Sequence, residues 1–295
     1  MIRIDQKRCE GCGTCALICA RYIPENSVRD GVKTTTISED RAAICIQCGQ
    51  CMAVCPNDAI HVKGVSQEDL RPTPKVEVTP EQLLSVLRHR RAVRRFKDRP
   101  VPRELMDQIV EALHWAPTAT SSGSTGVLIV DTPQRIEAMS KHMFALYEKV
   151  EGAMPNPIAR FMMKRRAGER AFTSLRDFVM PGMHWYLRWY RAGESNEITR
   201  GAPAIMIFHA PGNEPGADEN CTIAAWQAIL MAETLGLATC FNGLIPPPCN
   251  RLPELREMLG LSDDRQVFAS LSIGYPKYKF RKTIRRHLAE VRYLE

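Results

Sequence analysis

Two runs of four cysteines constrain this chain more than any other feature. The first run reads CEGCGTCALIC over residues 9–19, and the second reads CIQCGQCMAVCP over residues 45–56. In each run, three cysteines spaced three positions apart are followed by a fourth after four positions. This spacing is typical of proteins with two iron-sulfur clusters, in which the fourth cysteine of each run ligates the other cluster. The sequence therefore predicts two 4Fe-4S clusters.

The same rule assigns the thiolates crosswise between the runs. One cluster is expected to bind Cys9, Cys12, Cys15 and Cys55. The other is expected to bind Cys45, Cys48, Cys51 and Cys19. Glycines within both runs suit this role, because a loop that turns its amides toward sulfide needs backbone conformations that side chains obstruct.

Structural zinc and disulfides are the alternatives for so many cysteines. Zinc sites usually take four ligands as two CxxC pairs, which would leave a third cysteine idle in each run. Disulfides require an oxidising compartment, and the opening residues 1–5, MIRID, are not typical of a signal peptide. Two clusters remain the better interpretation.

Residues 1–63 resemble a bacterial-type two-cluster ferredoxin. Each half combines a cysteine run with a short predicted strand, at residues 1–4 and 59–63. One departure concerns the residue after each fourth cysteine, which is Pro56 in the second run but Ala20 in the first. That difference is expected to alter a loop and a cluster potential without removing a ligand.

The 295-residue length suits a small cofactor-held domain and one larger globular domain. Residues 64–78 are polar with two prolines and are expected to form a linker, so the second domain would span residues 79–295. The longest apolar region, 222–245, is interrupted by polar residues. We therefore expect a cytoplasmic protein without a membrane partner, because clusters and thiols suit a reducing interior. No nucleic-acid partner is expected, because deprotonated cluster ligands offset much of the formal charge of +7.

The most basic stretch, RHRRAVRRF at residues 88–96, is called the arginine segment below. It follows a predicted helix that begins at Thr79, where Gln82 would complete a capping box. By itself, such a run is typical either of a solvated or nucleic-acid-binding face or of a phosphate site. The residues alone leave these alternatives open.

The arginine segment resembles the R-R-S-V-R-x-F motif of the FMN-dependent nitroreductase family. This resemblance implies an α+β fold with a central mixed sheet flanked by helices, in an intertwined homodimer with FMN at the interface. It also implies a set of flavin-binding residues in this segment: Arg90, Arg91, Ala92 and Arg94. Ala92 replaces the usual serine.

Further motifs extend the resemblance over about residues 80–293. The loop APTATSSGSTG at 116–126 is similar to the family's A-P-S/T-x-x-N-x-Q-P loop and implies flavin contacts by Pro117, Thr118, Ala119 and Ser121. A strand-then-glycine turn implies backbone contacts at Asn242, Gly243 and Leu244. After the G-Y-P turn at 274–276, Arg285 or Arg286 matches the arginine that completes the phosphate site.

The resemblance implies an iron-sulfur flavoprotein oxidoreductase that passes electrons from its clusters to FMN and on to a nitroaromatic, quinone or enone-like acceptor. The electron donor would be ferredoxin, flavodoxin or NAD(P)H. No G-x-G-x-x-G motif of a Rossmann nicotinamide site follows a strand. A reduced electron-carrier protein such as ferredoxin is favoured over NADH. Alternatives are reductive dehalogenation or a cofactor-pathway reaction on this fold, and a redox sensor or electron shuttle without turnover. No catalytic residue is assigned. The aromatic cluster at 184–190 could pack, contact a subunit or cover a flat substrate.

Overall fold

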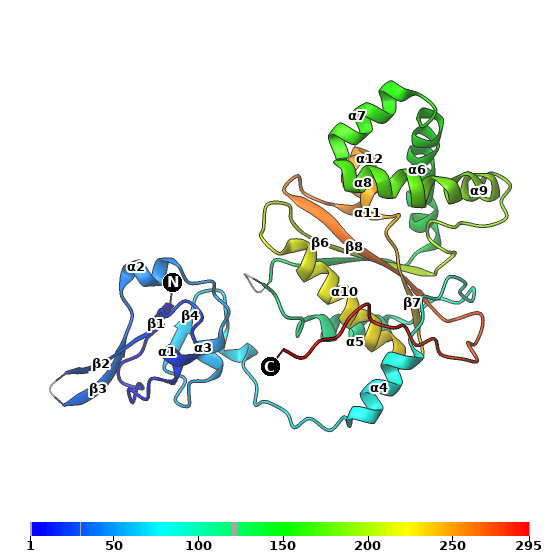
Figure 1. Cartoon of the computed structure of the whole chain (residues 1–295). Coiled ribbons are helices and arrows are strands. Elements are labelled where there is room, and N and C mark those ends of the chain that lie inside the picture. The colour runs from blue at the N-terminus through cyan, green and yellow to red at the C-terminus, as the bar shows by residue number, and fades with distance from the viewer. Residues whose placement is uncertain (1, 30, 120–122, 295) are drawn as a thin grey trace. The chain divides into compact units, whose positions relative to one another are not determined.

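The computed structural model describes residues 2–29, 31–119 and 123–294 (Figure 1). The chain divides into two compact units. The first comprises Met1–Glu77 and Thr118–Gly123, and the second comprises Val78–Pro117 and Ser124–Glu295.

The first unit is a small body of short helices and two antiparallel strand pairs, β1–β4 and β2–β3. Its elements are β1 (Ile2–Ile4), α1 (Thr14–Ile18), β2 (Glu25–Arg29), β3 (Val32–Thr36), α2 (Glu39–Ala43), α3 (Gln50–Ala53), β4 (Ile60–Val62) and the 3-10 turn η1 (Gln67–Asp69). The strands expected beside each cysteine run pair with each other, with Ile2 opposite Val62 and Ile4 opposite Ile60. Buried Ile23 and Met52 complete an apolar centre beside the cysteines.

The β2–β3 hairpin was not foreseen from the sequence, and it explains one glycine in the first cysteine run. Its strands pair antiparallel between the two cysteine runs. Gly11 has a φ of +65°, and a Cβ there would lie 2.3 Å from the carbonyl oxygen of Lys33 in β3. Only glycine permits both this backbone conformation and this close approach.

The second unit contains a four-stranded sheet in the order β5-β6-β8-β7. Its strands are β5 (Gly126–Val130), β6 (Ala204–Pro211), β7 (Ala238–Phe241) and β8 (Arg265–Gly274). Neighbouring strands run antiparallel. Ala92 adds a parallel bridge to Thr239 at the β7 edge, so the sheet is mixed, as predicted.

Helices cover both faces of this sheet (Figure 1). They are α4 (Pro80–His89), α5 (Arg103–Leu113), α6 (Pro133–Ala153), α7 (Pro157–Ala167), α8 (Glu169–Ser174), a π-helical turn η2 (Leu175–Val179), α9 (Met180–Arg191), α10 (Ala217–Thr234), α11 (Pro246–Arg251) and α12 (Pro253–Leu259). Alternate residues of β6 enter separate cores: Ile207 packs with α6, α9 and α11, whereas Phe208 packs with α5 and α10.

Local signals account for several helix boundaries. Thr79 and Gln82 form the predicted capping box at the start of α4. Pro246, the first of three consecutive prolines, opens α11. Proline is compatible with a first helical turn because its missing N–H would have no intrahelical partner there. None of the described helices is both long and apolar enough to cross a bilayer.

Candidate iron-sulfur and flavin sites

The first unit contains two small cysteine-lined cavities. One is lined by Cys9, Cys12, Cys15 and Cys55. The other is lined by Cys19, Cys45, Cys48 and Cys51. Each set takes three sulfur atoms from one run and the fourth from the other, which is the crosswise grouping expected from the spacing. The fold of the first unit thus brings each predicted set of four thiols together around one cavity.

The cysteines surround a space and do not converge on a point. Across the described residues, no three His, Cys, Asp or Glu side chains are close enough to hold a single metal ion. A four-iron cluster needs a wider arrangement, because each thiolate binds a different corner iron. The donor set and its spacing therefore fit 4Fe-4S clusters better than zinc.

Backbone amides support three of the sulfur atoms. Gly11 N–H donates to Cys9 Sγ at 3.4 Å and Ile23 N–H to Cys19 Sγ at 3.4 Å. Ala59 N–H donates to Cys55 Sγ at 3.3 Å. Hydrogen bonds of this kind stabilise thiolate charge and tune the potential of a cluster bound there.

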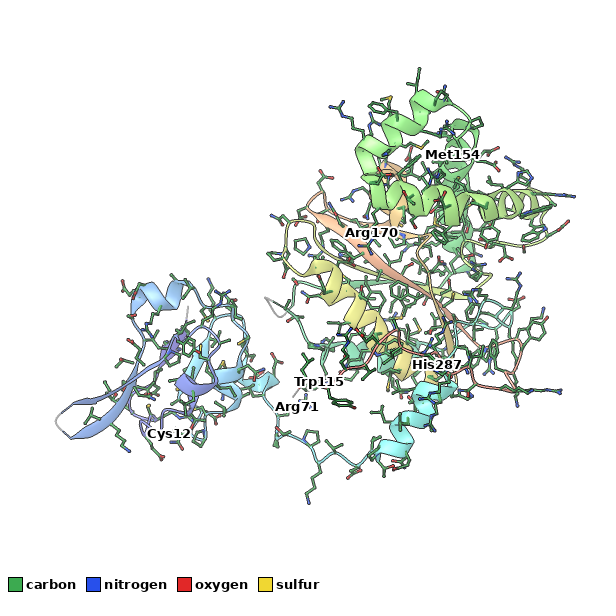
Figure 2. The ribbon with its side chains drawn as sticks, in the orientation of Figure 1. Cys12, Arg71, Trp115, Met154, Arg170 and His287 are labelled. Carbon is green, nitrogen blue, oxygen red and sulfur yellow. The ribbon has the colours of Figure 1, made fainter. Side chains whose placement is uncertain are left out.

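Exposure differs among the cysteines of each set. Cys12 is exposed on the first unit (Figure 2), and hydrogen bonding from the Thr14 hydroxyl lowers the pKa of its thiol. Burial raises the pKa of Cys51 to about 12. Iron must therefore displace a firmly held proton from Cys51, since the thiolate is the form that binds metal.

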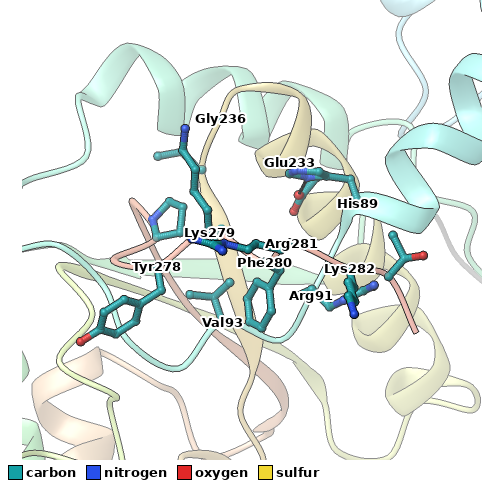
Figure 3. Close-up of a pocket in the computed structure, with 14 residues that line it drawn as sticks. His89, Arg91, Val93, Glu233, Gly236, Tyr278, Lys279, Phe280, Arg281 and Lys282 are labelled. Carbon is teal, nitrogen blue, oxygen red and sulfur yellow. Dashed lines mark hydrogen bonds and ion pairs between the residues drawn. The ribbon is translucent and has the colours of Figure 1, made fainter. Parts of the chain in front are cut away.

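The arginine segment contributes to the lining of a cavity in the second unit, which has a volume of about 520 Å³ (Figure 3). The segment begins in the last turn of α4, which ends at His89, and is extended from Arg90 onward, so alternate side chains there point to opposite sides. His89, Arg91 and Val93 face the cavity. Arg90 instead lies over the ring of Trp226 in α10, with 5.4 Å between the guanidinium carbon and the ring centroid.

The cavity is rich in cations. The chain after β8 adds Lys279, Arg281 and Lys282 to Arg91, while Glu233 bonds His89 across one wall (Figure 3). The Nε and Nη2 atoms of Arg91 are buried and have no hydrogen-bond partner among the described residues. Buried guanidinium donors without partners favour an anionic ligand, and phosphate matches their planar geometry. The unpaired donors of Arg91 and the neighbouring cations therefore fit the phosphate of a flavin.

The turn after β7 exposes its backbone. Asn242 is buried, and its side-chain amide donates to the Ile198 carbonyl and to Ser272 Oγ. Its Oδ1 accepts from Leu244 N–H. Gly243 is exposed, and its N–H bonds none of the residues that the structure describes. Asn242 N–H donates to the Ser270 carbonyl, so among the N–H groups of residues 242–244 only that of Gly243 is available to a ligand.

The remaining expected flavin residues are more scattered. Ala92 is held at the β7 edge by its bridge to Thr239, and Arg94 is exposed. Pro117 is the last residue of the segment Val78–Pro117 of the second unit, whereas Thr118 and Ala119 belong to the first unit. Ser121 lies outside the described residues. Within the second unit, neither Pro117 nor the described residues 124–126 line the 520 Å³ cavity.

The cations that line the cavity after the G-Y-P turn differ from the two that the resemblance implies. Arg285 and Arg286 are exposed and do not line the cavity, whereas Lys279, Arg281 and Lys282 do. The basic character of this stretch was visible in the sequence. Its contacts were not, because an irregular chain carries no periodicity that marks which side chains turn inward.

Two family comparisons agree with this geometry. Residues 87–275 match the Nitroreductase family. The chain belongs to this family. Residues 8–60 match the 4Fe-4S dicluster domain, which implies two 4Fe-4S clusters. The eight cysteines of the two runs supply the required ligands. The resemblance stated from the sequence is thereby confirmed.

Nitroreductase relatives are distant in sequence. A Methanothermobacter thermautotrophicus protein, whose name places it with the NADH dehydrogenases and NAD(P)H nitroreductases, is 22% identical over 204 residues, covering 68% of this chain and 80% of its own length. The NAD(P)H-dependent FMN reductase of Bacillus subtilis is 26% identical over 202 residues, covering 66% of this chain and 66% of its own length, just under two thirds.

A solved nitroreductase confirms the predicted α+β fold. The FMN-bound structure from Bacteroides fragilis aligns with a TM-score of 0.53 at 20% identity. It covers 72% of this chain and 99% of that protein. At this identity, the likeness concerns the fold alone.

Proposed function

We propose that this nitroreductase-family chain is an iron-sulfur flavoprotein oxidoreductase. It passes electrons from two 4Fe-4S clusters to FMN and on to a small organic acceptor, such as a nitroaromatic, quinone or enone-like compound. The observation that carries this proposal is the crosswise pair of cysteine cavities on a chain whose other unit is a nitroreductase domain. The acceptor class rests on the family.

The iron-sulfur part of the proposal uses all eight cysteines of the two runs. Cys9, Cys12, Cys15 and Cys55 would hold one cluster, and Cys19, Cys45, Cys48 and Cys51 the other. Amide donors to three of these sulfur atoms support the assignment. The two cavities lie in the first unit, so both clusters would be independent of the flavin domain's own folding.

The flavin part of the proposal uses the cation-rich cavity and the turn after β7. Arg91 offers buried donors without partners, and Arg281 and Lys279 add positive charge for the phosphate. Gly243 offers a free backbone N–H for the ring. FMN supplies both one-electron and two-electron chemistry when bound, which suits a path from one-electron clusters to a two-electron acceptor.

We infer a homodimer with FMN at its interface. Exposed apolar side chains on the neighbouring helices α4 and α10 support this inference, since an isolated monomer gains nothing by exposing them. They are Leu83 (49% exposed), Leu84 (44%), Ile223 (38%) and Trp226 (42%).

Reduced ferredoxin or flavodoxin is proposed as the electron donor, although NAD(P)H appears in the names of three relatives. A fused dicluster unit offers an entry point for single electrons, which nicotinamide does not need. Stopped-flow mixing of the anaerobic holoprotein with each donor tests this. Rapid flavin reduction by NADH that persists in a C12S/C48S variant lacking both clusters would contradict it.

The first experiment is anaerobic purification with iron, sulfide and FMN quantitation. About eight irons and one FMN per chain are expected, as two four-iron clusters require. An ultraviolet-visible spectrum before and after dithionite should then show both chromophores reduced. Eight irons without flavin would overturn the flavoenzyme proposal in favour of an electron shuttle or redox sensor.

A further inference from the structure

Helix α7 turns its apolar side away from the protein. None of its residues is buried. Ile158, Phe161 and Met162 are 70%, 64% and 48% exposed and lie on one side of the helix, at i, i+3 and i+4. The half-buried residues follow the opposite stripe: Ala159, Met163 and Ala167. This is the reverse of an ordinary surface helix, whose large apolar residues face the core.

Cations border the exposed apolar row of α7. Arg165 continues the stripe seven positions after Ile158, and Arg166 lies beside it. Neither arginine is paired with any residue that the structure describes, whereas Lys164 pairs with Glu169 at 2.5 Å. Residues 157–176 contain six basic residues and one acidic residue, a net charge of +5, in a chain whose formal charge is +7.

The position of α7 leaves this surface accessible within the second unit. In Figure 1, α7 lies beyond the end of α6, on the side away from the sheet. Met154 and Arg170 mark the two ends of the region in Figure 2. The apolar row therefore lies on a convex helix at the outer end of the helical segment.

We propose that α7 docks on the surface of an anionic lipid bilayer. Phe161, Ile158 and Met162 would enter the boundary between headgroups and acyl chains. Arg165 and Arg166 would meet lipid phosphates, because their long aliphatic stems let the charged ends reach the headgroups. An apolar stripe bordered by Lys and Arg is the pattern of helices that lie in the membrane interface. Such a helix needs no membrane-spanning segment.

A fluid bilayer suits this surface better than a protein partner does. A rigid partner would need a groove shaped to three large side chains on a convex helix. Acyl chains adapt to any such shape, and an anionic leaflet attracts unpaired cations near it. The proposal does not depend on the flavin chemistry proposed above.

Flotation of the full-length holoprotein with lipid vesicles tests the proposal. The protein should float with vesicles of phosphatidylcholine and phosphatidylglycerol, and not with phosphatidylcholine alone, and binding should weaken as salt rises. R165Q/R166Q should reduce partitioning about 25-fold, at about fivefold per cation. I158S/F161S should reduce it about tenfold or more. K141Q/K149Q removes the same charge from exposed positions of α6 and should change binding far less.

Several outcomes would overturn the proposal. These are failure of the wild type to float, equal binding to neutral vesicles, and unchanged binding of I158S/F161S. Light scattering and far-UV circular dichroism of the variants complete the test. If I158S/F161S lowers the oligomeric mass while keeping its helix content, the face belongs to an interface between copies of this chain, and the lipid proposal is wrong.

Discussion

Arg95 and Glu197, 102 positions apart in the sequence, form a two-pronged ion pair. Arg95 Nη2 lies 2.7 Å from Glu197 Oε1, and Arg95 Nη1 donates to Oε2 at 3.1 Å. The Glu197 side chain is only 3% exposed and also pairs with Arg200 at 2.7 Å. The adjacent Ile198 accepts from Asn242. This carboxylate thus fastens the arginine segment beside the residues that support the turn after β7.

Glu197→Ala should destabilise the protein. The change leaves Arg95 and Arg200 facing each other without their shared carboxylate. We expect the free energy of unfolding to fall by about 2 kcal/mol, less than for a fully buried pair because the Arg95 side chain is half exposed. Thermal unfolding of the holoprotein measures this. Glu194→Ala removes an exposed carboxylate three positions earlier and serves as the control.

Acid should remove the contribution of Glu197. Burial alone would raise the pKa of this carboxyl, but hydrogen bonding from Arg95 and the charge of Arg200 outweigh burial and hold the pKa below its ordinary value of 4.5. The stabilisation is therefore present above that value and is lost as the pH falls through the lower pKa of the folded state. The melting-temperature gap between wild type and Glu197→Gln should be constant above about pH 5.5 and shrink below 4.5. A gap that widens on acidification would contradict this.

Paired cysteine variants distinguish crosswise from within-run ligation. If Cys9 and Cys55 share a cluster, C9S/C55S should keep about four irons, because only one cluster loses ligands. C9S/C19S should lose both clusters. Ligation within each run predicts the reverse result, so iron and sulfide quantitation of the two variants decides between them.

Gly11→Ala should disturb the first cluster, and Gly31→Ala provides a matched control. Both glycines have positive φ, +65° and +78°, so each substitution costs about 1–2 kcal/mol of backbone strain. At Gly11 the new methyl would meet backbone, 2.3 Å from the Lys33 carbonyl oxygen, whereas a methyl at Gly31 would have no described atom within 4 Å apart from its chain neighbours. We expect Gly11→Ala to keep about four irons and Gly31→Ala about eight. Equal iron contents would show that the hairpin does not constrain this loop.

Local patterns predicted much of this structure, and contacts across the chain set the rest. The capping box of Thr79 and Gln82, the β1–β4 pair and the mixed sheet followed from short-range signals or from the resemblance. The β2–β3 hairpin has few apolar residues, and its packing depends on a glycine in another loop. No sequence pattern predicts the Arg95–Glu197 pair, because its two residues are 102 positions apart. The cations that line the large cavity depend on the course of an irregular segment.

Arg91 and Arg281 should decide the affinity for FMN. A hydrogen bond to a charged group contributes about 1.5–3 kcal/mol, so Arg91→Gln or Arg281→Gln should weaken FMN binding about 10- to 100-fold. Quenching of FMN fluorescence on titration with apoprotein measures the dissociation constant. Lys149→Gln, an exposed change on α6, should leave it unaltered.

The sequence resemblance instead favours Arg285 or Arg286 for the phosphate, so the R285Q/R286Q variant separates the two assignments. If R285Q/R286Q weakens binding and Arg281→Gln does not, the C-terminal segment reaches the phosphate through its later arginines, and the cavity in Figure 3 serves another ligand.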